Sequence, residues 1–160
     1  MAEDAIKRRL AAILAADVAG YSRLMGADEE GTFNTLKACR QSIDGWVAEK
    51  GGRIVATGGD SVLAEFTSAV EAVRCALAMQ EGIAACNIDV PEERCMRFRI
   101  GINLGEIIID TDGDIFGDGV NIAARLEELA TPGSVNISED VYRQILGRLD
   151  AGLHDLGRQN

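Results

Sequence analysis

Two aspartates, Asp17 and Asp60, are the residues best placed to do chemistry. Each lies beside glycine: an apolar run over residues 10–17 ends in Asp17, with Gly20 three residues later, and Asp60 follows Gly58-Gly59 between two β-like runs. Such a carboxylate pair suits Mg²⁺ or Mn²⁺, which use one or two protein carboxylates together with substrate phosphates. The alternative is a pair of turn acids that only solvate loop ends. The apolar strands that lead into both acids favour the metal site.

The elements that would position these acids follow from the apolar pattern. Residues 10–17 are typical of a buried central strand, and Asp60 would lie at the tip of a hairpin. If the central strand pairs with the hairpin, the two acids converge at one edge of the sheet. In chain order we expect a strand over 10–17, a helix over 28–50, a hairpin over 53–56 and 62–66, a helix over 68–85, strands over 97–103 and 105–110, a helix over 120–126, a strand over 134–137 and a helix over 138–149.

Length and composition fit one domain over residues 1–160, with an α+β sheet covered by helices. Sixteen Lys and Arg against 26 Asp and Glu give a net charge of -10, and only 4% of residues are aromatic. This balance argues against nucleic acid or anionic lipid as a partner. A bound polyanion would need metal ions, and no stretch approaches the roughly 20 apolar residues of a membrane span.

The cysteines and the first residues bear on location. The chain has four cysteines and no CxxC pair: Cys39, Cys75, Cys86 and Cys95. We expect these cysteines to be small buried hydrophobic residues in a reducing cytoplasm. The run Lys7-Arg8-Arg9 before an apolar segment could be mistaken for a secretion signal. Its apolar part is only seven residues long, and cleavage there would remove Asp17, so we predict a cytoplasmic protein.

Four segments, in order, resemble the catalytic domain of class III nucleotidyl cyclases, the adenylate and guanylate cyclase family. The match runs from about residue 10 to 157, and the segments are Leu14–Ser22, Gly51–Arg53 with Gly59–Ser61, Arg97–Ile102 and Asp114–Leu126. The resemblance implies a ferredoxin-like core with a mostly antiparallel sheet. It also implies an antiparallel homodimer whose interface sites convert a nucleoside triphosphate, preferably ATP, to the 3',5'-cyclic nucleotide and pyrophosphate in signalling.

The resemblance also implies roles on the metal side of the site. Asp17 and Asp60, with the Val18 carbonyl, would hold two Mg²⁺ or Mn²⁺ ions. Arg99 would contact the terminal phosphates. Gly20 and Gly59 would give the phosphates room. Considered alone, Arg99 could equally be an outward-facing strand residue.

The resemblance implies further roles for residues on a helix of the partner chain and for a residue that recognises the base. Asn121 would orient the ribose and Arg125 would stabilise charge on the α-phosphate; four residues apart, they share one helix face. Their structural alternatives are a helix cap for Asn121 and a salt bridge with Glu128 for Arg125. Asp114 matches the position that reads the purine edge.

The sequence departs from the family pattern at two places. Ala56 stands where adenylate cyclases carry a base-recognising Lys and guanylate cyclases usually carry Glu. The missing hydrogen bond to a charged group corresponds to about 1.5–3 kcal/mol of discrimination. The chain also ends at Asn160, before the region where the family usually has a phosphate-binding Lys, which indicates a truncated C-terminal end.

Two rival functions remain open. Gly58-Gly59-Asp60 resembles the start of the diguanylate cyclase signature, but Ser61 and Val62 replace its Glu and Phe, and that family has no role for Asn121 and Arg125. The other rival is a catalytically silent cyclase-like domain that binds nucleotide or dimerises. The loss of Lys at position 56 favours this second rival.

Overall fold

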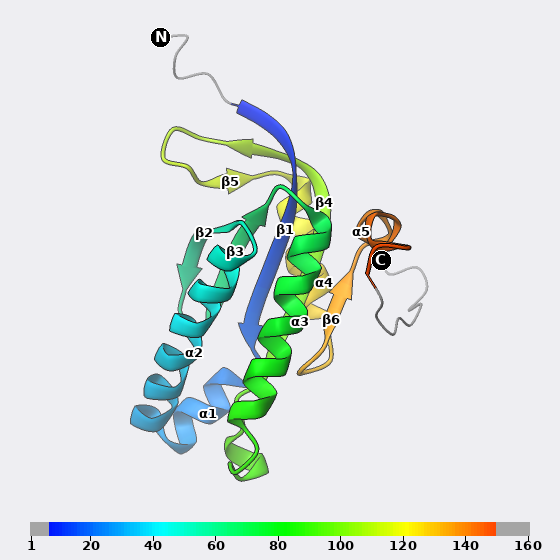
Figure 1. The fold of residues 1–160 in the computed structure, drawn as a ribbon. Coiled ribbons are helices and arrows are strands. Elements are labelled where there is room, and N and C mark those ends of the chain that lie inside the picture. Colours follow the sequence, from blue (N-terminus) through cyan, green and yellow to red (C-terminus); the bar gives the residue numbers. More distant parts are fainter. Residues whose placement is uncertain (1–6, 150–160) are drawn as a thin grey trace.

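The computed structural model describes residues 7–149 as an α+β fold in which helices pack on a mostly antiparallel sheet (Figure 1). Five strands follow the order β2-β3-β1-β4-β5, and β6 pairs in parallel with β4. The elements are β1 (Lys7–Val18), α1 (Tyr21–Ala27), α2 (Glu29–Glu49), β2 (Gly52–Gly58), β3 (Ser61–Phe66), α3 (Ala69–Cys86), the 3-10 helix η2 (Glu92–Arg94), β4 (Phe98–Ile109), β5 (Ile115–Phe116), α4 (Asp118–Glu128), β6 (Val135–Ile137) and α5 (Glu139–Ile145).

Strand β1 is the centre of the sheet, as its apolar run predicts. It pairs antiparallel with β3 on one side and with β4 along its whole length on the other. Residues 11–16 are buried because both faces of the strand are covered. The segment that could be mistaken for part of a secretion signal is thus a central strand.

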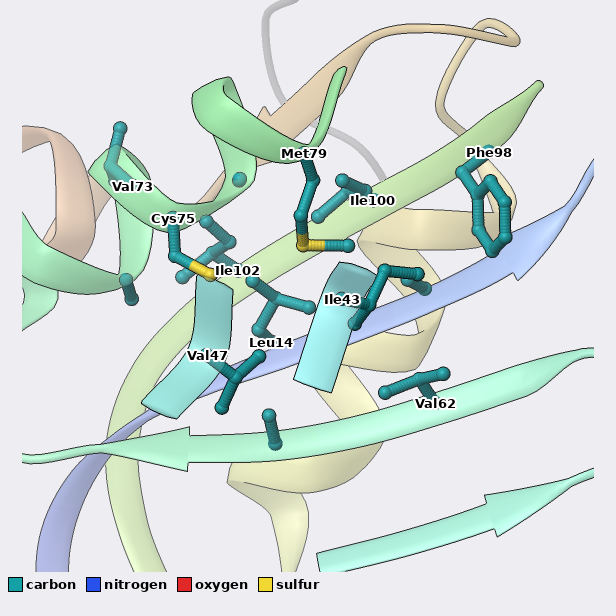
Figure 2. Packing of buried hydrophobic residues seen from close by; sticks show 14 of the residues in the cluster. Leu14, Ile43, Val47, Val62, Val73, Cys75, Met79, Phe98, Ile100 and Ile102 are labelled. Carbon is teal, nitrogen blue, oxygen red and sulfur yellow. The ribbon is translucent and has the colours of Figure 1, made fainter. Parts of the chain in front are cut away.

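The larger core lies between the sheet and helices α2 and α3, which lie side by side over one face (Figures 1 and 2). Ile43 and Val47 of α2, Met79 of α3 and the even-numbered residues of β1 belong to this one cluster. Both helices start as their sequences indicate, because Asp28 and Ser68 accept hydrogen bonds from backbone N–H groups three residues on. A smaller cluster on the opposite face packs under α4.

Helix α4 approaches the sheet closely because position 101 is glycine. A Cβ atom at Gly101 would lie 2.3 Å from the Glu127 backbone nitrogen and 2.4 Å from the Ala123 carbonyl oxygen. Farther along β4, buried Asn103 donates a hydrogen bond to the Gly119 carbonyl at 3.1 Å. Both ends of α4 are therefore fixed against the central strands.

Some predicted elements differ from the structure. The two strands expected over 97–103 and 105–110 are one strand, β4, because Gly105 continues the β1 pairing opposite Ala11. Helix α1 and the two-residue strand β5 were not expected, since both are short and lack a clear apolar period. Helix α4 begins at Asp118, two residues earlier than the pattern suggests.

The expectation that all four cysteines are buried is wrong in part. Cys75 and Cys95 are buried, Cys39 is half-buried and Cys86 is exposed at the end of α3. Burial raises the pKa of Cys75 to about 11, so this thiol stays protonated and unreactive at neutral pH.

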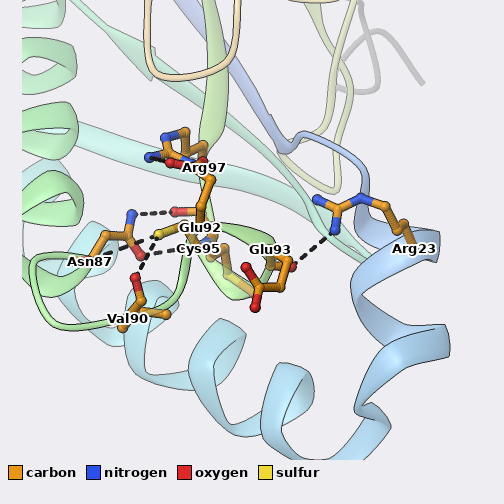
Figure 3. A network of polar contacts seen from close by, with 8 residues as sticks. Arg23, Asn87, Val90, Glu92, Glu93, Cys95 and Arg97 are labelled. Carbon is orange, nitrogen blue, oxygen red and sulfur yellow. Dashed lines mark hydrogen bonds and ion pairs between the residues drawn. The ribbon is translucent and has the colours of Figure 1, made fainter.

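The segment between α3 and β4, which contains the short helix η2, is held by polar contacts (Figure 3). The Asn87 side chain donates to the Met96 carbonyl and accepts from the Met96 N–H. Arg23 reaches across from α1 to the Glu93 carbonyl at 3.0 Å. These contacts fix the chain just before β4 begins.

The Gly101 contact predicts that Gly101→Ala destabilises the fold by about 1–3 kcal/mol, because the added methyl would press on backbone atoms that cannot rotate away. Gly45→Ala in α2 is the matched control, since its Cβ meets nothing within 4 Å and should stabilise the helix by about 0.5–1 kcal/mol. Urea unfolding of both variants measures the difference. Equal effects of the two substitutions would contradict the packing argument.

Candidate active site

The two predicted metal-binding aspartates meet at one end of the central strands. Asp17 is the penultimate residue of β1, and Asp60 lies in the β2–β3 turn. The Val18 N–H donates to Asp60 Oδ2 at 3.1 Å, which places the second carboxylate beside the residue that follows the first. The pairing of Ala16 with Val62 brings them together. The predicted convergence of the two acids is confirmed.

Arg99 lies against Asp17 because the two residues are direct cross-strand partners of β1 and β4. Arg99 Nε donates to Asp17 Oδ1 at 3.0 Å, and Nη2 donates to Oδ2 at 2.7 Å. Such a two-pronged contact fixes the carboxylate in orientation as well as in place. Arg99 is therefore part of the site, and the outward-facing alternative is wrong.

Glu127 is a third carboxylate of the site, and sequence reasoning missed it. It lies in the last turn of α4 with 7% of its surface exposed, and its Oε2 is 3.3 Å from Arg99 Nη2. Burial, with the nearby Asp17 charge, raises the pKa of Glu127 to about 7, although Arg99 opposes this shift. The only sequence signal was its place four residues after Ala123 on the buried face of the helix.

Arg40 of α2 holds the turn that carries Asp60. Its Nη2 donates to the Gly59 carbonyl and, at 3.2 Å, to the Ser61 carbonyl, the two residues on either side of Asp60. Sequence reasoning placed Arg40 only within a helix. The residues in contact are about twenty positions apart in the sequence, so no local sequence pattern predicts the contact.

Asn121 and Arg125 lie on the exposed side of α4, whereas Ala123 and Glu127 face the sheet. The predicted shared face is confirmed. Because the helix begins at Asp118 with Gly117 as its cap, Asn121 is not a helix cap. The same helix therefore turns one carboxylate toward its own Asp17 and presents Asn121 and Arg125 on its surface.

The two residues at base-recognition positions lie away from Asp17 in the same chain. Ala56 is opposite Leu63, which is in turn opposite Ala15. Asp114 is exposed in the turn after β4, at the other end of that strand from Arg99. Within a single chain, Asp114 therefore does not lie beside the pair of carboxylates Asp17 and Asp60.

The family model for the adenylate and guanylate cyclase catalytic domain matches residues 6–157. The chain belongs to this family. It is 50% identical over 158 residues to a putative adenylate cyclase 3 of Rhizobium meliloti, covering 98% of the chain and 27% of that relative. It is 33% identical to an adenylate cyclase of Streptomyces coelicolor, covering 93% and 37% of the two chains. This cyclase domain thus spans well under half the length of these relatives.

Solved structures agree with the family. An adenylate/guanylate cyclase/hydrolase from Silicibacter pomeroyi superimposes with a TM-score of 0.88 at 47% identity, covering 96% of this chain and 89% of that one. The adenylyl cyclase CyaB from P. aeruginosa shares the fold, with a TM-score of 0.78 at 24% identity, over 90% and 84% of the two chains. The predicted cyclase fold is confirmed. Within residues 7–149, no helix of the cyclase domain combines the length and apolarity needed to cross a membrane.

The raised pKa of Glu127 predicts a pH-dependent stability in the absence of metal. Between the ordinary value of 4.5 and about 7, folded Glu127 keeps a proton that the unfolded chain releases. The free energy of unfolding therefore falls as pH rises through this window, by on the order of 3 kcal/mol. Glu127→Gln removes the titrating group. The free energy of unfolding of this variant, relative to that of the wild type, should therefore increase as pH rises from about 5 to about 8.

Urea unfolding across that pH range tests this expectation, with Glu128→Gln as the control because Glu128 is the exposed neighbour. The control should keep the wild-type pH dependence. Parallel stability curves for the wild type and Glu127→Gln would show that Glu127 does not hold the proton.

Proposed function

We propose that this domain converts a nucleoside triphosphate, with ATP preferred, into the 3',5'-cyclic nucleotide and pyrophosphate. Family membership supports nucleotide cyclisation in general. The observation that carries the proposal for this chain is the meeting of Asp17 and Asp60 beside Arg99. This arrangement offers a divalent cation two carboxylates and offers the substrate phosphates a guanidinium.

Two Mg²⁺ or Mn²⁺ ions fit the donors that are present. Asp17, Asp60 and the Val18 carbonyl supply hard oxygen ligands, and a carboxylate bonded to Arg99 keeps further lone pairs for a cation. No group of three or more candidate metal-binding side chains was found among residues 7–149, so substrate phosphates would complete the shell. Bound there, the ions would neutralise the triphosphate and favour ionisation of the ribose 3'-hydroxyl.

The protein's own part is to hold the reacting groups in line. Attack of a ribose oxygen on the α-phosphorus of the same molecule depends on positioning and charge neutralisation more than on a strong base. Arg40 keeps the Asp60 turn in place, and Arg99 orients Asp17 and would contact the terminal phosphates. Gly20 and Gly59, both with positive φ, leave space beside the two acids.

The active form would be a homodimer with shared sites. Asn121 and Arg125 are exposed on α4, on the side of the helix that is turned away from the sheet of their own chain. Exposed apolar residues accompany them: Ile122 and Leu129 on or next to the same helix are each 46% exposed, and Phe116 is 50% exposed. A partner that covers this surface would bury apolar area and complete the site. A role in cytoplasmic signalling is part of the same proposal.

Cyclic nucleotide formation tests the proposed activity directly. The purified chain is incubated separately with ATP, GTP, CTP and UTP in the presence of Mn²⁺, and the products are separated by chromatography. We expect cyclic AMP as the main product, and Asp60→Asn should abolish it because one metal ligand loses its charge. Absence of a cyclic product from all four nucleotides would reject the enzyme and favour the silent nucleotide-binding module that Ala56 suggests.

Shared sites predict complementation between two inactive chains. Asp60→Ala removes a metal ligand and Asn121→Ala removes a ribose contact, so each homodimer should be inactive. A mixed dimer contains one site with neither change and should recover activity, up to half of the wild-type value per dimer. Mixed dimers isolated through two different affinity tags provide the measurement. Inactive mixed dimers would argue that each site is built within one chain.

A further inference from the structure

A buried acid with two arginine partners lies on the α4 side of the sheet, apart from Asp17. Glu65 of β3 is 4% exposed, and its Oε1 accepts a hydrogen bond from Arg9 Nη2 at 2.6 Å. The same oxygen accepts from Arg53 Nε at 2.8 Å and from Arg53 Nη2. Burial alone would raise the pKa of Glu65, but the two guanidinium groups outweigh burial and hold it below its usual value. Arg53 is thus anchored by a charged carboxylate.

A bulge in β2 turns Arg53 toward the face that carries Ala56. Arg53 is paired with Glu65, and Ala56 with Leu63, while the register shifts between Ile54 and Ala56. Since residues 63 and 65 of one strand share a face, their partners Arg53 and Ala56 share it too. A regular strand would place residues three apart on opposite faces. The bulge therefore sets a cation next to the position where the family's base-recognising Lys is missing.

Arg53 also reaches the turn that carries Asp114. Its Nη2 donates to the Gly113 carbonyl at 3.0 Å, across 60 residues of sequence. The turn is ordered from within, because Asp110 Oδ1 accepts from the N–H groups of Asp112 and Asp114. Arg53 thus links the strand that carries Ala56 to the turn with the purine-reading aspartate.

We propose that Arg53 is a specificity-determining residue, which supplies beside Asp114 the cationic donor that Ala56 lacks. Its Nη1 makes no hydrogen bond to residues 7–149, and its side chain is 46% exposed. Nη1 can therefore donate to a ring nitrogen of adenine while Asp114 accepts from the exocyclic amino group. This inference rests on the proposed function, because it takes the base to be read between positions 56 and 114.

Arg53→Ala and Arg9→Ala form a matched pair for the test. Both remove a guanidinium from Glu65, but only Arg53 contacts Gly113. We expect Arg53→Ala to lower kcat/KM for ATP tenfold to a hundredfold, mainly through KM, and to shrink the ATP-to-GTP preference by a similar factor. Arg9→Ala should leave that preference within twofold of the wild type. Adding Ala56→Lys to Arg53→Ala should restore the preference.

Binding of 3'-deoxy-ATP and 3'-deoxy-GTP with Mn²⁺, measured by calorimetry, separates base reading from turnover. These analogues lack the attacking hydroxyl and cannot be cyclised, so the experiment measures binding alone. The base preference can therefore be measured even for a chain without cyclase activity. Arg53→Met, which keeps an unbranched side chain but has no hydrogen-bond donor, serves if Arg53→Ala fails to fold. An unchanged preference in the folded Arg53 variants would overturn the inference while the proposed function stands. Loss of preference in an inactive chain would support the inference and reject the cyclase proposal.

Discussion

The antiparallel pairing of β1 with β3 and β4 is the constraint on which the rest of the structure depends. Its register sets Asp17 opposite Arg99 and brings the Asp60 turn to the end of β1. A shift of one residue would carry Asp17 to the face packed under α2 and α3, where a carboxylate would lie in an apolar core. An unpaired carboxylate in that core would cost several kcal/mol, which disfavours the shift. The apolar core under α2 and α3 thereby keeps Asp17 on the other face of the sheet.

The position of helix α4 depends on this pairing, and the two sides of the helix have different roles. The backbone contact at Gly101 fixes its distance from β4, which brings Glu127 to Arg99 and leaves Asn121 and Arg125 outside. Under the proposed function, the inner side supports the site of its own chain and the outer side completes the site of the partner. Since both sides belong to one rigid helix, displacement of α4 from the sheet would disturb both sites together.

Much of the fold and part of the site could be predicted from the sequence. The central strand, the hairpin with Asp60 and helices α2 and α3 follow from local apolar patterns and caps, and the meeting of Asp17 with Asp60 follows from strand pairing. Arg40, Arg53 and Glu127 were missed because their contacts join residues far apart in the chain. The bulge that turns Arg53 to the face of Ala56 also has no local signature, since Ile54-Val55-Ala56 reads as an ordinary strand.

The charges at the site explain why a triphosphate would need cations. Asp17 and Glu127 lie against Arg99, Asp60 accepts a hydrogen bond from the Val18 N–H next to Asp17, and Arg40 is bonded to backbone carbonyls. Even with Glu127 protonated, two aspartates stand against the one guanidinium that pairs with Asp17. An approaching triphosphate would add several negative charges to this excess in a partly buried setting, where repulsion is screened less than in water. Divalent cations bound by the aspartates reverse the sign of the local field, so the acids that repel the bare substrate become the groups that retain it.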